Sequence, residues 1–488
     1  MKMPLATVGP AGLSQSENFD SGMRELTLPA RSLPLDDSWD VIVIGGGPSG
    51  CTAAVAAARE GARTLLIEST ASFGGSGTIA LVPAWCPFSD KQKIIYRGLA
   101  EKVFNAAKSG MAHVGQDDLD WVPIDAERLK RVYDDLVTSA GVKVKFQTLL
   151  AGVETDGEGG VTSILVANKH GLSALRAKVY VDCSGDADLA AWAGAEFHKG
   201  DSMGQMQPGT LCFILSNVDE HAYLNGPDLG WWNPQSPIHQ ILASGRYPEI
   251  PDRHMNSNII GPGTVGFNAG HVWDVDNTDP DSVSRAIMRG RKLAFAYRNA
   301  LAEFHPDAFG NCFLVSTGSV LGVRETRRIV GDYILSADDY LSRRAFPDEI
   351  CRNSYFIDLH LTKEEAKTND ELKMALRFKH YDPGESHGIP YRCLTPRGLR
   401  NVLIAGRSIS CDRPVQGSVR VMPVCLAMGE AAGMAAAHAS HLPAHDVHAV
   451  DVEFLRKRLR EENVYLPMLA AESPGESAAD QKDYLAAV

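Results

Sequence analysis

The chain has 488 residues, 44% of them hydrophobic and 22% charged, and its formal net charge is −12 at pH 7. This length allows two or more domains with a sizeable core, and the negative charge argues against nucleic acid or an anionic membrane surface as a partner. No apolar run reaches the roughly 18 residues of a membrane-spanning helix, so we expect no membrane span.

The nine cysteines are scattered along the chain and include no C-x-x-C pair. The sequence therefore predicts neither a zinc site nor a redox disulfide, and we expect no metal site. The odd number of cysteines favours reduced thiols and a cytoplasmic location. Residues 1–37 are rich in Ser, Pro, Gly and Leu, and we expect them to form a loose arm or to pack on a partner subunit.

A glycine-rich loop between a strand and a helix lies near the N-terminus. Residues 41–44 form a continuous apolar run, as in a parallel strand buried on both faces. Gly45, Gly47 and Gly50 follow with the spacing G-x-G-x-x-G. The first makes a tight turn, the second lets a pyrophosphate approach the backbone, and the third lets helix and strand touch. The pyrophosphate would then lie at a helix N-terminus, where the dipole favours negative charge.

A second strand, residues 64–67, ends at Glu68 about 20 residues beyond the glycines. An acidic side chain at this point can bind a ribose hydroxyl. Strand, loop, helix, strand and acid together predict a dinucleotide-binding unit rather than a merely structural turn.

Turns of small residues follow other strands as well. Residues 73–78 form a second glycine cluster, which would bring backbone close to a flat or phosphorylated ligand or would be a flexible loop. Residues 182–189 follow a buried strand and either approach a ligand or form an ordinary strand-to-helix turn. Residues 401–406 are another buried strand that ends in glycine, and Pro423 is well placed to begin a helix.

Hydrophobic periodicity predicts the remaining elements. The predicted helices span residues 124–140, 281–304, 424–437 and 451–463, with helix and loop mixed over 91–120; the predicted strands span 142–150, 153–168 and 172–181, with a turn at 156–160; residues 470–488 are expected to form a frayed tail.

Three glycine-bearing strand ends interrupted by a large insert resemble the FAD domain of glutathione-reductase-type flavoproteins, which have two dinucleotide-binding domains. Within that fold, the sequence resembles the bacterial FAD-dependent oxidoreductase family. The matching stretches are residues 45–50, 73–78, 182–189, 324–333, 388–397 and 405–423, and the resemblance covers about residues 38–465.

The resemblance implies an α/β fold, with a Rossmann-like FAD-binding domain and a large α+β substrate or cap insert. The expected divisions are an N-terminal arm (1–37), three parts of the FAD-binding domain (38–80, 124–199 and 396–445), an insert or cap segment (81–123), a substrate or cap domain (200–395), and a C-terminal helix and tail (446–488).

The resemblance also implies FAD as the cofactor. Glu68 would hold the adenosine ribose, and the backbone near Leu150 would meet the adenine. Val421 and Met422 would present N–H groups to the flavin pyrimidine edge, because a helix N-terminus stabilises the negative charge of reduced flavin. The expected FAD contacts are Gly45, Gly47, Pro48, Ser49, Gly50, Glu68, Gly74, Gly75, Ser76, Thr78, Leu150, Ser184, Gly185, Gly406, Arg407, Arg420, Val421 and Met422.

Two stretches depart from the family pattern. Ser69 and Thr70 stand where such folds often carry a basic residue, which suggests weaker adenosine contacts. Residues 270–274 lie where a more ordinary strand is expected, which suggests a substrate pocket particular to this protein.

Hydride transfer often requires a second group that takes a proton. His387 is the first candidate for this role, since its loop leads into the third flavin strand, and His271 is the second; either could instead be a loop histidine without a catalytic role. Tyr391 with Arg392 is a further candidate pair for handling a proton. The arginines could bind a carboxylate or polarise a carbonyl, or they could form salt bridges with Glu325 and Asp332; these arginines are Arg324, Arg327, Arg328 and Arg392. We expect segments 324–328 and 388–392 both to border the reactive side of the flavin.

The sequence thus predicts an FAD-dependent oxidoreductase that transfers a hydride between flavin N5 and a small polar molecule: an alcohol, an amine or a carbon–carbon bond next to a carbonyl. The alternatives are a flavin monooxygenase and a non-catalytic FAD-binding subunit of a complex. The missing C-x-x-C disfavours a disulfide reductase. The electron acceptor is not identified by the sequence, and a homodimer is one assembly left open.

Overall fold

The computed structural model describes residues 29–30, 32–368 and 379–467. The tail predicted at 470–488 and most of the predicted arm lie outside these residues. The end of that arm is corrected, because β1 (Leu35–Ile44) begins inside it and pairs from Leu35 with Ala174.

The predicted dinucleotide unit forms one side of a parallel sheet. Strand β1 lies between β2 and β6 and is parallel to both, and its last four residues are buried on both faces. β3 extends the sheet beyond β2, and β15 pairs with the end of β6. These elements are α1 (Pro48–Arg59), β2 (Thr64–Ile67), β3 (Lys143–Lys145), β6 (Gly171–Asp182) and β15 (Val402–Ile404).

The first half of β6 also belongs to an antiparallel meander with β5 (Val161–Asn168) and β4 (Leu149–Thr155). The strand predicted over 142–150 is wrong as one element, because the chain turns at Gln147, whose φ is +49°, and forms β3 and β4. The turn predicted at 156–160 joins β4 to β5, where the Asp156 carboxylate accepts hydrogen bonds from Glu158 N and Gly160 N at 2.8 Å.

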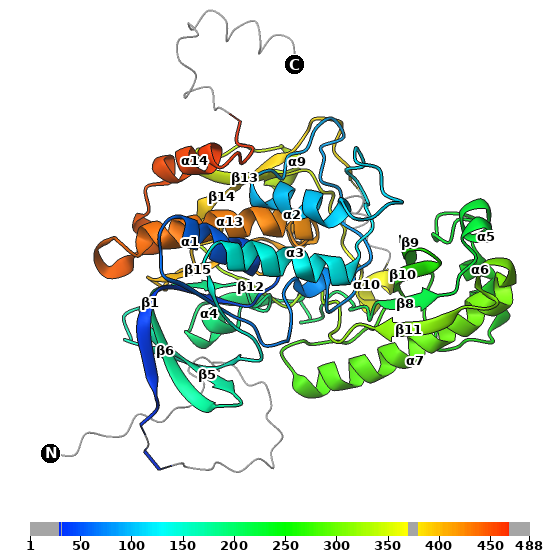
Figure 1. Cartoon of the computed structure of the whole chain (residues 1–488), viewed down its shortest axis with the longest axis horizontal. Coiled ribbons are helices and arrows are strands. Elements are labelled where there is room, and N and C mark those ends of the chain that lie inside the picture. Colours follow the sequence, from blue (N-terminus) through cyan, green and yellow to red (C-terminus); the bar gives the residue numbers. More distant parts are fainter. Residues whose placement is uncertain (1–28, 31, 369–378, 468–488) are drawn as a thin grey trace, which may run out of the picture.

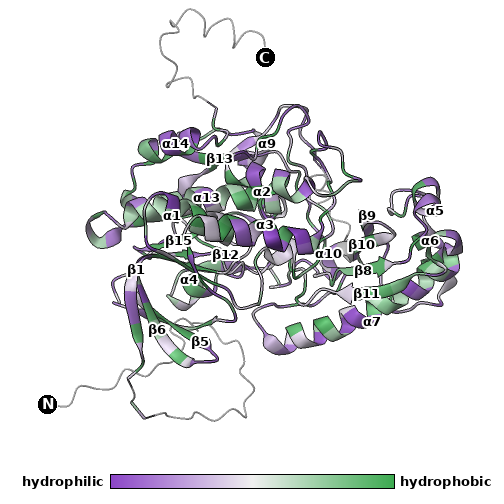
Figure 2. Ribbon diagram, in the orientation of Figure 1, coloured by the Kyte–Doolittle hydropathy of each residue, from purple (hydrophilic) through white to green (hydrophobic). Residues whose placement is uncertain are grey.

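Helix α13 (Met422–Ala439) crosses the middle of this domain and packs on α1 (Figure 1). Glycines make the crossing close: a Cβ on Gly429 would lie 2.2 Å from Ser49 O, and one on Gly433 would lie 1.9 Å from Ala53 O. Nearly all of α13 is buried. In Figure 2 its ribbon is mostly coloured as hydrophobic, whereas the outer helices near it also carry hydrophilic stretches. Among the described residues no single helix is long and apolar enough to span a membrane; α12 (Arg413–Val419) and α13 meet that criterion only as a pair, bent by 91°.

A second lobe is built on the antiparallel sheet β11-β8-β10-β9, against which the 25-residue helix α7 packs (Figure 1). The predicted helix 281–304 is confirmed, with Asp279 capping its first turn. The lobe comprises β8 (Phe213–Ser216), α5 (Glu220–Asn225), α6 (Pro237–Ser244), β9 (Met255–Gly261), β10 (Thr264–Ala269), α7 (Pro280–Phe304), α8 (Pro306–Phe309) and β11 (Phe313–Thr317).

The buried cores correct the expected domain limits. The core of the second lobe runs from Phe213 to Cys312. By contrast, the described residues between 329 and 394 and the segment 81–123 contribute to the core of the FAD-binding domain, through side chains such as Trp85, Phe104 and Tyr340. The expected substrate domain of 200–395 is therefore too long at its C-terminal end, because its last third packs on α13 and its neighbours.

The other elements surround this larger core, and α3 and α14 match the helices predicted at 124–140 and 451–463. They are α2 (Leu99–Lys108), α3 (Ala126–Ser139), α4 (Asp188–Trp192), α9 (Ala337–Leu341), α10 (Lys363–Thr368), α12 (Arg413–Val419), α14 (Val452–Glu461), the pair β7 (Phe197–Lys199) and β12 (Arg327–Ile329), and the pair β13 (Glu349–Asn353) and β14 (His387–Pro390).

Candidate active site

A cavity of about 1530 Å³ opens at the carboxyl ends of the parallel strands. Ile44, Ile67, Cys183 and Ala405, at or just after the ends of β1, β2, β6 and β15, all line it. This edge is where open α/β sheets bind ligands. The second lobe supplies much of the remaining wall, so one cavity joins the two lobes.

The glycine-rich loop has the shape that a pyrophosphate requires. Gly45 has φ +94°, and a Cβ there would lie 2.5 Å from Cys183 O. A Cβ on Gly50 would lie 1.7 Å from Gly45 O, so this position needs glycine for packing. Gly47 differs, since apart from its neighbours in the chain no atom of the described residues lies within 4 Å of its potential Cβ. Gly47 lines the cavity, so the space beside its backbone is open to a ligand.

Two helices begin at the cavity without a side-chain cap. Gly47 is the N-cap of α1 and Val421 is the N-cap of α13, and neither N-cap residue supplies a side-chain hydrogen bond to the first turn. Helix N-termini carry unpaired N–H groups and a partial positive charge. The first suits a pyrophosphate and the second suits an electron-rich carbonyl edge.

Glu68 lines the cavity next to the glycine loop. Its two carboxylate oxygens accept hydrogen bonds from Gly46 N and Thr70 N, both at 2.7 Å. These bonds fix the carboxylate while its other lone pairs can accept from ribose hydroxyls. Thr70, one of the departures from the family pattern, thus positions Glu68 through its backbone.

Arg407 and the turn after β6 meet across the cavity. Arg407 pairs with Asp186 at 2.5 Å. A Cβ on Gly185 would lie only 2.4 Å from Nη1 of Arg407. Burial, followed by the charges of Asp186 and Asp182, raises the pKa of Asp188 to about 6.

Most of the expected FAD contacts line this cavity, and three do not. Gly50 packs on the loop, and Gly74, with φ +97°, shapes the second glycine turn, which Thr78 closes by donating to Phe73 O at 2.6 Å. The contacts that line the cavity are Gly45, Gly47, Pro48, Ser49, Glu68, Gly75, Ser76, Leu150, Ser184, Gly185, Gly406, Arg407, Arg420, Val421 and Met422. The open space at Gly47, the two uncapped helices and the fixed carboxylate together fit FAD.

The second lobe and the loop after β13 bring a chain of acidic and imidazole groups into the same cavity. His271 Nδ1 lies 2.6 Å from Asp252 Oδ2, and His271 Nε2 lies 2.8 Å from His360 Nδ1. His360 Nε2 in turn lies 3.4 Å from Asp358 Oδ1. The four residues form one chain, Asp252–His271–His360–Asp358, and each of them lines the cavity.

The chain ends beside the start of α13. The second oxygen of Asp358 accepts from Arg420 Nη2 and from the Tyr355 hydroxyl, both at 3.1 Å. Arg420 directly precedes Val421, the N-cap of α13. The imidazole chain is therefore tied to the helix start at which we expect the flavin ring.

Three histidines of this cavity lie close enough to be tested as metal ligands. Ligand atoms of His254, His271 and His360 lie within 4.8 Å of one another. However, the His254 and His271 rings are stacked, with centroids 4.2 Å apart and planes at 14°. Because imidazole lone pairs lie in the ring plane, stacked rings cannot both point at one ion without turning. The contacts of His271 and His360 are spaced as hydrogen bonds.

The structure places Arg324 in the cavity wall, where it is buried. Its guanidinium donates to Pro208 O at 2.7 Å and to Thr210 Oγ1 at 3.0 Å. Burial, and then the charge of Arg420, lowers the pKa of Arg324 to about 10.

The remaining catalytic candidates from the sequence do not reach the cavity, which corrects the expectation for segment 388–392. His387 is fully buried beside Tyr381, 3.0 Å from its hydroxyl, and burial lowers the pKa of His387 to about 3. Tyr391 donates to Val447 O at 2.8 Å, and Arg392 pairs at 2.8 Å with Asp348 on the outer surface. Strand β14 pairs with β13 and is buried throughout, so His387 lies in the core of the FAD-binding domain and not at the cavity.

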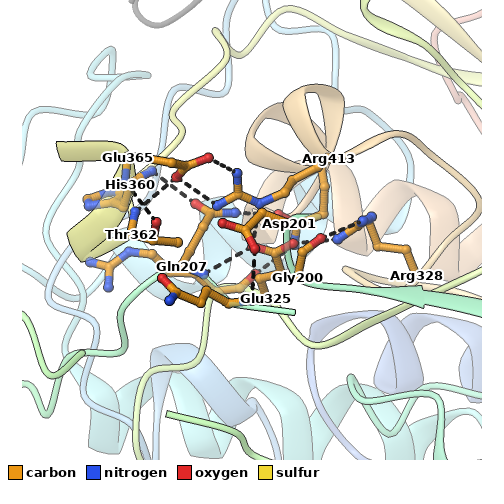
Figure 3. Close-up of polar contacts among 12 residues, drawn as sticks. Gly200, Asp201, Gln207, Glu325, Arg328, His360, Thr362, Glu365 and Arg413 are labelled. Atoms are coloured by element: carbon orange, nitrogen blue, oxygen red, sulfur yellow. Dashed lines mark hydrogen bonds and ion pairs between the residues drawn. The ribbon is translucent and has the colours of Figure 1, made fainter. Parts of the chain in front are cut away.

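A buried ionic network behind the cavity holds His360 in place (Figure 3). Gln207 accepts from His360 N at 3.0 Å, and Gln207 N donates to Glu325 at 3.0 Å. Glu325 and Glu365 both pair with Arg413. Figure 3 shows these side chains converging from α12, α10 and the segment before β12.

His254, His360, Asp252 and Asp358 were not predicted from the sequence. His271 is separated from Asp252 by 19 residues and from His360 by 89. No local spacing motif connects such positions, so only the fold brings them together. The glycines, by contrast, are recognisable because their functions are local.

Comparison with known proteins gives a family match over most of the chain. Residues 40–459 match the FAD dependent oxidoreductase family. Among curated proteins, the chain is 28% identical over 175 residues to a digeranylgeranylglycerophospholipid reductase of Methanocaldococcus jannaschii, covering 34% of this chain and 43% of that protein. It is 34% identical over 58 residues to a 3-oxosteroid 1-dehydrogenase of Comamonas testosteroni, covering 12% and 10%. The matches thus span less than half of these relatives.

Solved structures with a similar arrangement include a geranylgeranyl bacteriochlorophyll reductase-like protein of Thermoplasma acidophilum, at 15% identity and TM-score 0.42, covering 88% of this chain and 84% of that one. Another is p-nitrophenol 4-monooxygenase of Pseudomonas putida, at 12% identity and TM-score 0.39, covering 93% of each chain. The family match names FAD dependent oxidoreductases in general and not the glutathione-reductase-type subclass that the sequence suggested. The family match extends over most of the chain, and the protein belongs to the FAD dependent oxidoreductase family.

Proposed function

We propose that this enzyme transfers a hydride between flavin N5 of bound FAD and a small polar organic molecule, namely an alcohol, an amine or a carbon–carbon bond next to a carbonyl. The observation that carries the proposal is the single cavity that runs from the dinucleotide loop to the chain Asp252–His271–His360–Asp358. When bound, FAD supplies the hydride acceptor or donor. The side chains of Asp252, His271, His360 and Asp358 handle protons and bind polar groups.

The cavity is large enough to hold both a cofactor and a substrate. Its volume of about 1530 Å³ exceeds the roughly 300–1,000 Å³ typical of a pocket for one drug-sized ligand. Beyond the residues that fit FAD, the wall contains amides, histidines and aromatic rings, among them Asn256, Asn268, Trp273 and Tyr355. Such a mixture suits a molecule that carries hydroxyl, amine or carbonyl groups on a hydrocarbon frame. Trp273 and His271 belong to segment 270–274, which the sequence suggested as a pocket.

The test is anaerobic mixing of the purified yellow protein with panels of alcohols, amines and saturated carbonyl compounds, while the visible absorbance of the flavin is followed. A substrate for oxidation bleaches the flavin without any other reductant. The reverse direction is tested by reducing the flavin photochemically and adding unsaturated or carbonyl compounds, which should restore the colour.

The same experiment discriminates between the alternatives. If the flavin is bleached only by a nicotinamide, and reoxidation by oxygen then hydroxylates an added aromatic compound, the protein is a monooxygenase. If no compound of these classes changes the flavin in either direction, the hydride-transfer proposal fails.

A further inference from the structure

We propose that His360 is the proton acceptor of this active site, and that His271 and Asp252 position it. The proposal rests on the hydride-transfer function proposed above and assigns the proton that accompanies the hydride. In the oxidation of an alcohol or amine, the O–H or N–H bond breaks and its proton moves to Nε2 of His360. The hydrogen of the adjacent C–H bond leaves with its electron pair as the hydride.

A count of protons along the chain supports this assignment. The chain has three contacts: Asp252 with His271, His271 with His360, and His360 with Asp358. Each hydrogen bond needs one proton, and a neutral imidazole carries only one. Two neutral histidines between two carboxylates therefore supply two protons for three contacts. All three contacts can be hydrogen bonds only after these four residues have taken up one more proton.

The distances indicate which contact lacks its proton. The contacts of 2.6 Å and 2.8 Å are hydrogen bonds, whereas the 3.4 Å contact of His360 Nε2 with Asp358 is longer than an ordinary one. Asp252 accepts from His271 Nδ1–H, and His271 Nε2 then accepts from His360 Nδ1–H. The lone pair of His360 Nε2 remains, and Asp358 is placed to stabilise a proton that arrives there.

The charges around His360 keep this nitrogen unprotonated in the resting protein. Burial, and then the positive charge of Arg324, lowers the pKa of His360 well below its ordinary value, while Asp358 acts in the opposite direction and His271 adds to the lowering. Arg420 partly neutralises Asp358, with which it pairs at 3.1 Å. The other facing groups are Asp252, behind His271, and His254, whose ring packs edge-on against His360.

The chain is also placed where a substrate can reach it. His360 and His271 line the cavity that the expected flavin contacts line, and Asp358 connects them to Arg420 at the start of α13. Gln207 holds the backbone of His360, which fixes the ring relative to the FAD-binding domain.

The first experiment needs no substrate: nitrogen NMR of the imidazole side chains in the full-length protein with FAD bound. We expect both His271 and His360 to carry their proton on Nδ1 at neutral pH. In Asp252→Asn an amide that can donate replaces a carboxylate that only accepts, so the tautomer of His271 should change, and that of His360 with it. The matched control is His448→Gln, since His448 pairs with Asp332 at 2.7 Å outside the cavity and should leave both signals unchanged.

The second experiment uses any compound that bleaches the flavin. His360→Gln should slow flavin reduction by about 10²–10⁴-fold, the usual loss for a proton acceptor, with FAD content unchanged. Asp252→Asn should have a smaller effect and shift the pH dependence, which a purely structural change would not do. His448→Gln again serves as the control.

Three results would overturn the assignment. One is a proton on Nε2 of His360 at neutral pH, because the acceptor site is then already filled. Another is an unchanged rate of flavin reduction in His360→Gln. The third is one equivalent of transition metal per chain in the purified protein that is lost in His271→Gln, which would make the histidines ligands. The NMR result stands whether or not a substrate is found, so failure of the proposed function and failure of this assignment are distinguishable.

Discussion

Gly47 separates ligand binding from folding more cleanly than any other residue of the loop. No protein atom lies within 4 Å of a Cβ at this position, and its φ of −71° suits any residue. We therefore expect Gly47→Val to fold normally and to lose FAD, because its side chain fills the space that the pyrophosphate needs. The flavin absorbance of purified protein and its circular dichroism measure the two effects separately.

The matched change in the same loop is Gly50→Ala, whose Cβ would lie 1.7 Å from Gly45 O. This variant should lose stability as well as FAD. If Gly47→Val retains full FAD occupancy, the assignment of the loop is wrong.

Arg324 sets the pH range over which His360 can accept a proton. Its positive charge disfavours the imidazolium and contributes to the lowered pKa of His360. Arg324→Gln removes this charge, so the pKa should rise and the acid limb of substrate oxidation should move to higher pH. The measurement is the pH profile of flavin reduction with FAD content as the control, and an acid limb that stays in place or moves lower would contradict the electrostatic argument.

The packing of α13 on α1 depends on two glycines. A Cβ on Gly433 would lie 1.9 Å from the backbone oxygen of Ala53, which cannot move without displacing α1. Gly433→Ala should therefore lower the free energy of unfolding by about 1–3 kcal/mol or more, as in other overpacked cores. Gly261→Ala in β9, where no atom lies within 4 Å, is the control and should change it little. Denaturant unfolding compares the two variants.

Glu430 of α13 caps the first turn of α2, where its carboxylate accepts from Leu99 N at 2.8 Å. Burial nevertheless raises the pKa of Glu430 to about 7. Because the folded-state pKa lies above the unfolded value, the associated stability is fully present below about pH 4.5 and is lost as the pH rises through about 7. The loss amounts to about 3 kcal/mol. Glu430→Gln keeps an acceptor for Leu99 N, so unfolding measured between pH 5 and 8 should become flatter; an unchanged slope would show that Glu430 is not responsible.

The sequence predicts the elements whose cause is local. The strand, glycine loop, helix and acid up to Glu68 follow from covalent and steric rules within about 30 residues, and the long helix α7 follows from its periodicity. The boundary between the lobes cannot be predicted in this way, because the described residues between 329 and 394 join the larger core through contacts with α13 and the segment 81–123, which are distant in sequence. His387 fails as a candidate for the same reason: its strand is drawn into that core.

The buried network around Arg413 connects these distant parts and carries a last prediction. Arg413, at the start of α12, pairs with Glu325 before β12 and with Glu365 on α10, and all three side chains are nearly inaccessible. Arg413→Met removes the cation that the two buried carboxylates share, although Glu325 keeps its ion pair with Arg328. The loss should cost about 3 kcal/mol, the low end for breaking a buried ion pair, and loosen the Gln207 contact that holds His360. Arg131→Met is the matched control, since its pair with Asp135 is about 70% exposed on both sides and is worth about 0–1 kcal/mol. Thermal unfolding with FAD bound compares them, and similar losses in the two variants would show that the buried network stabilises the protein no more than an exposed ion pair does.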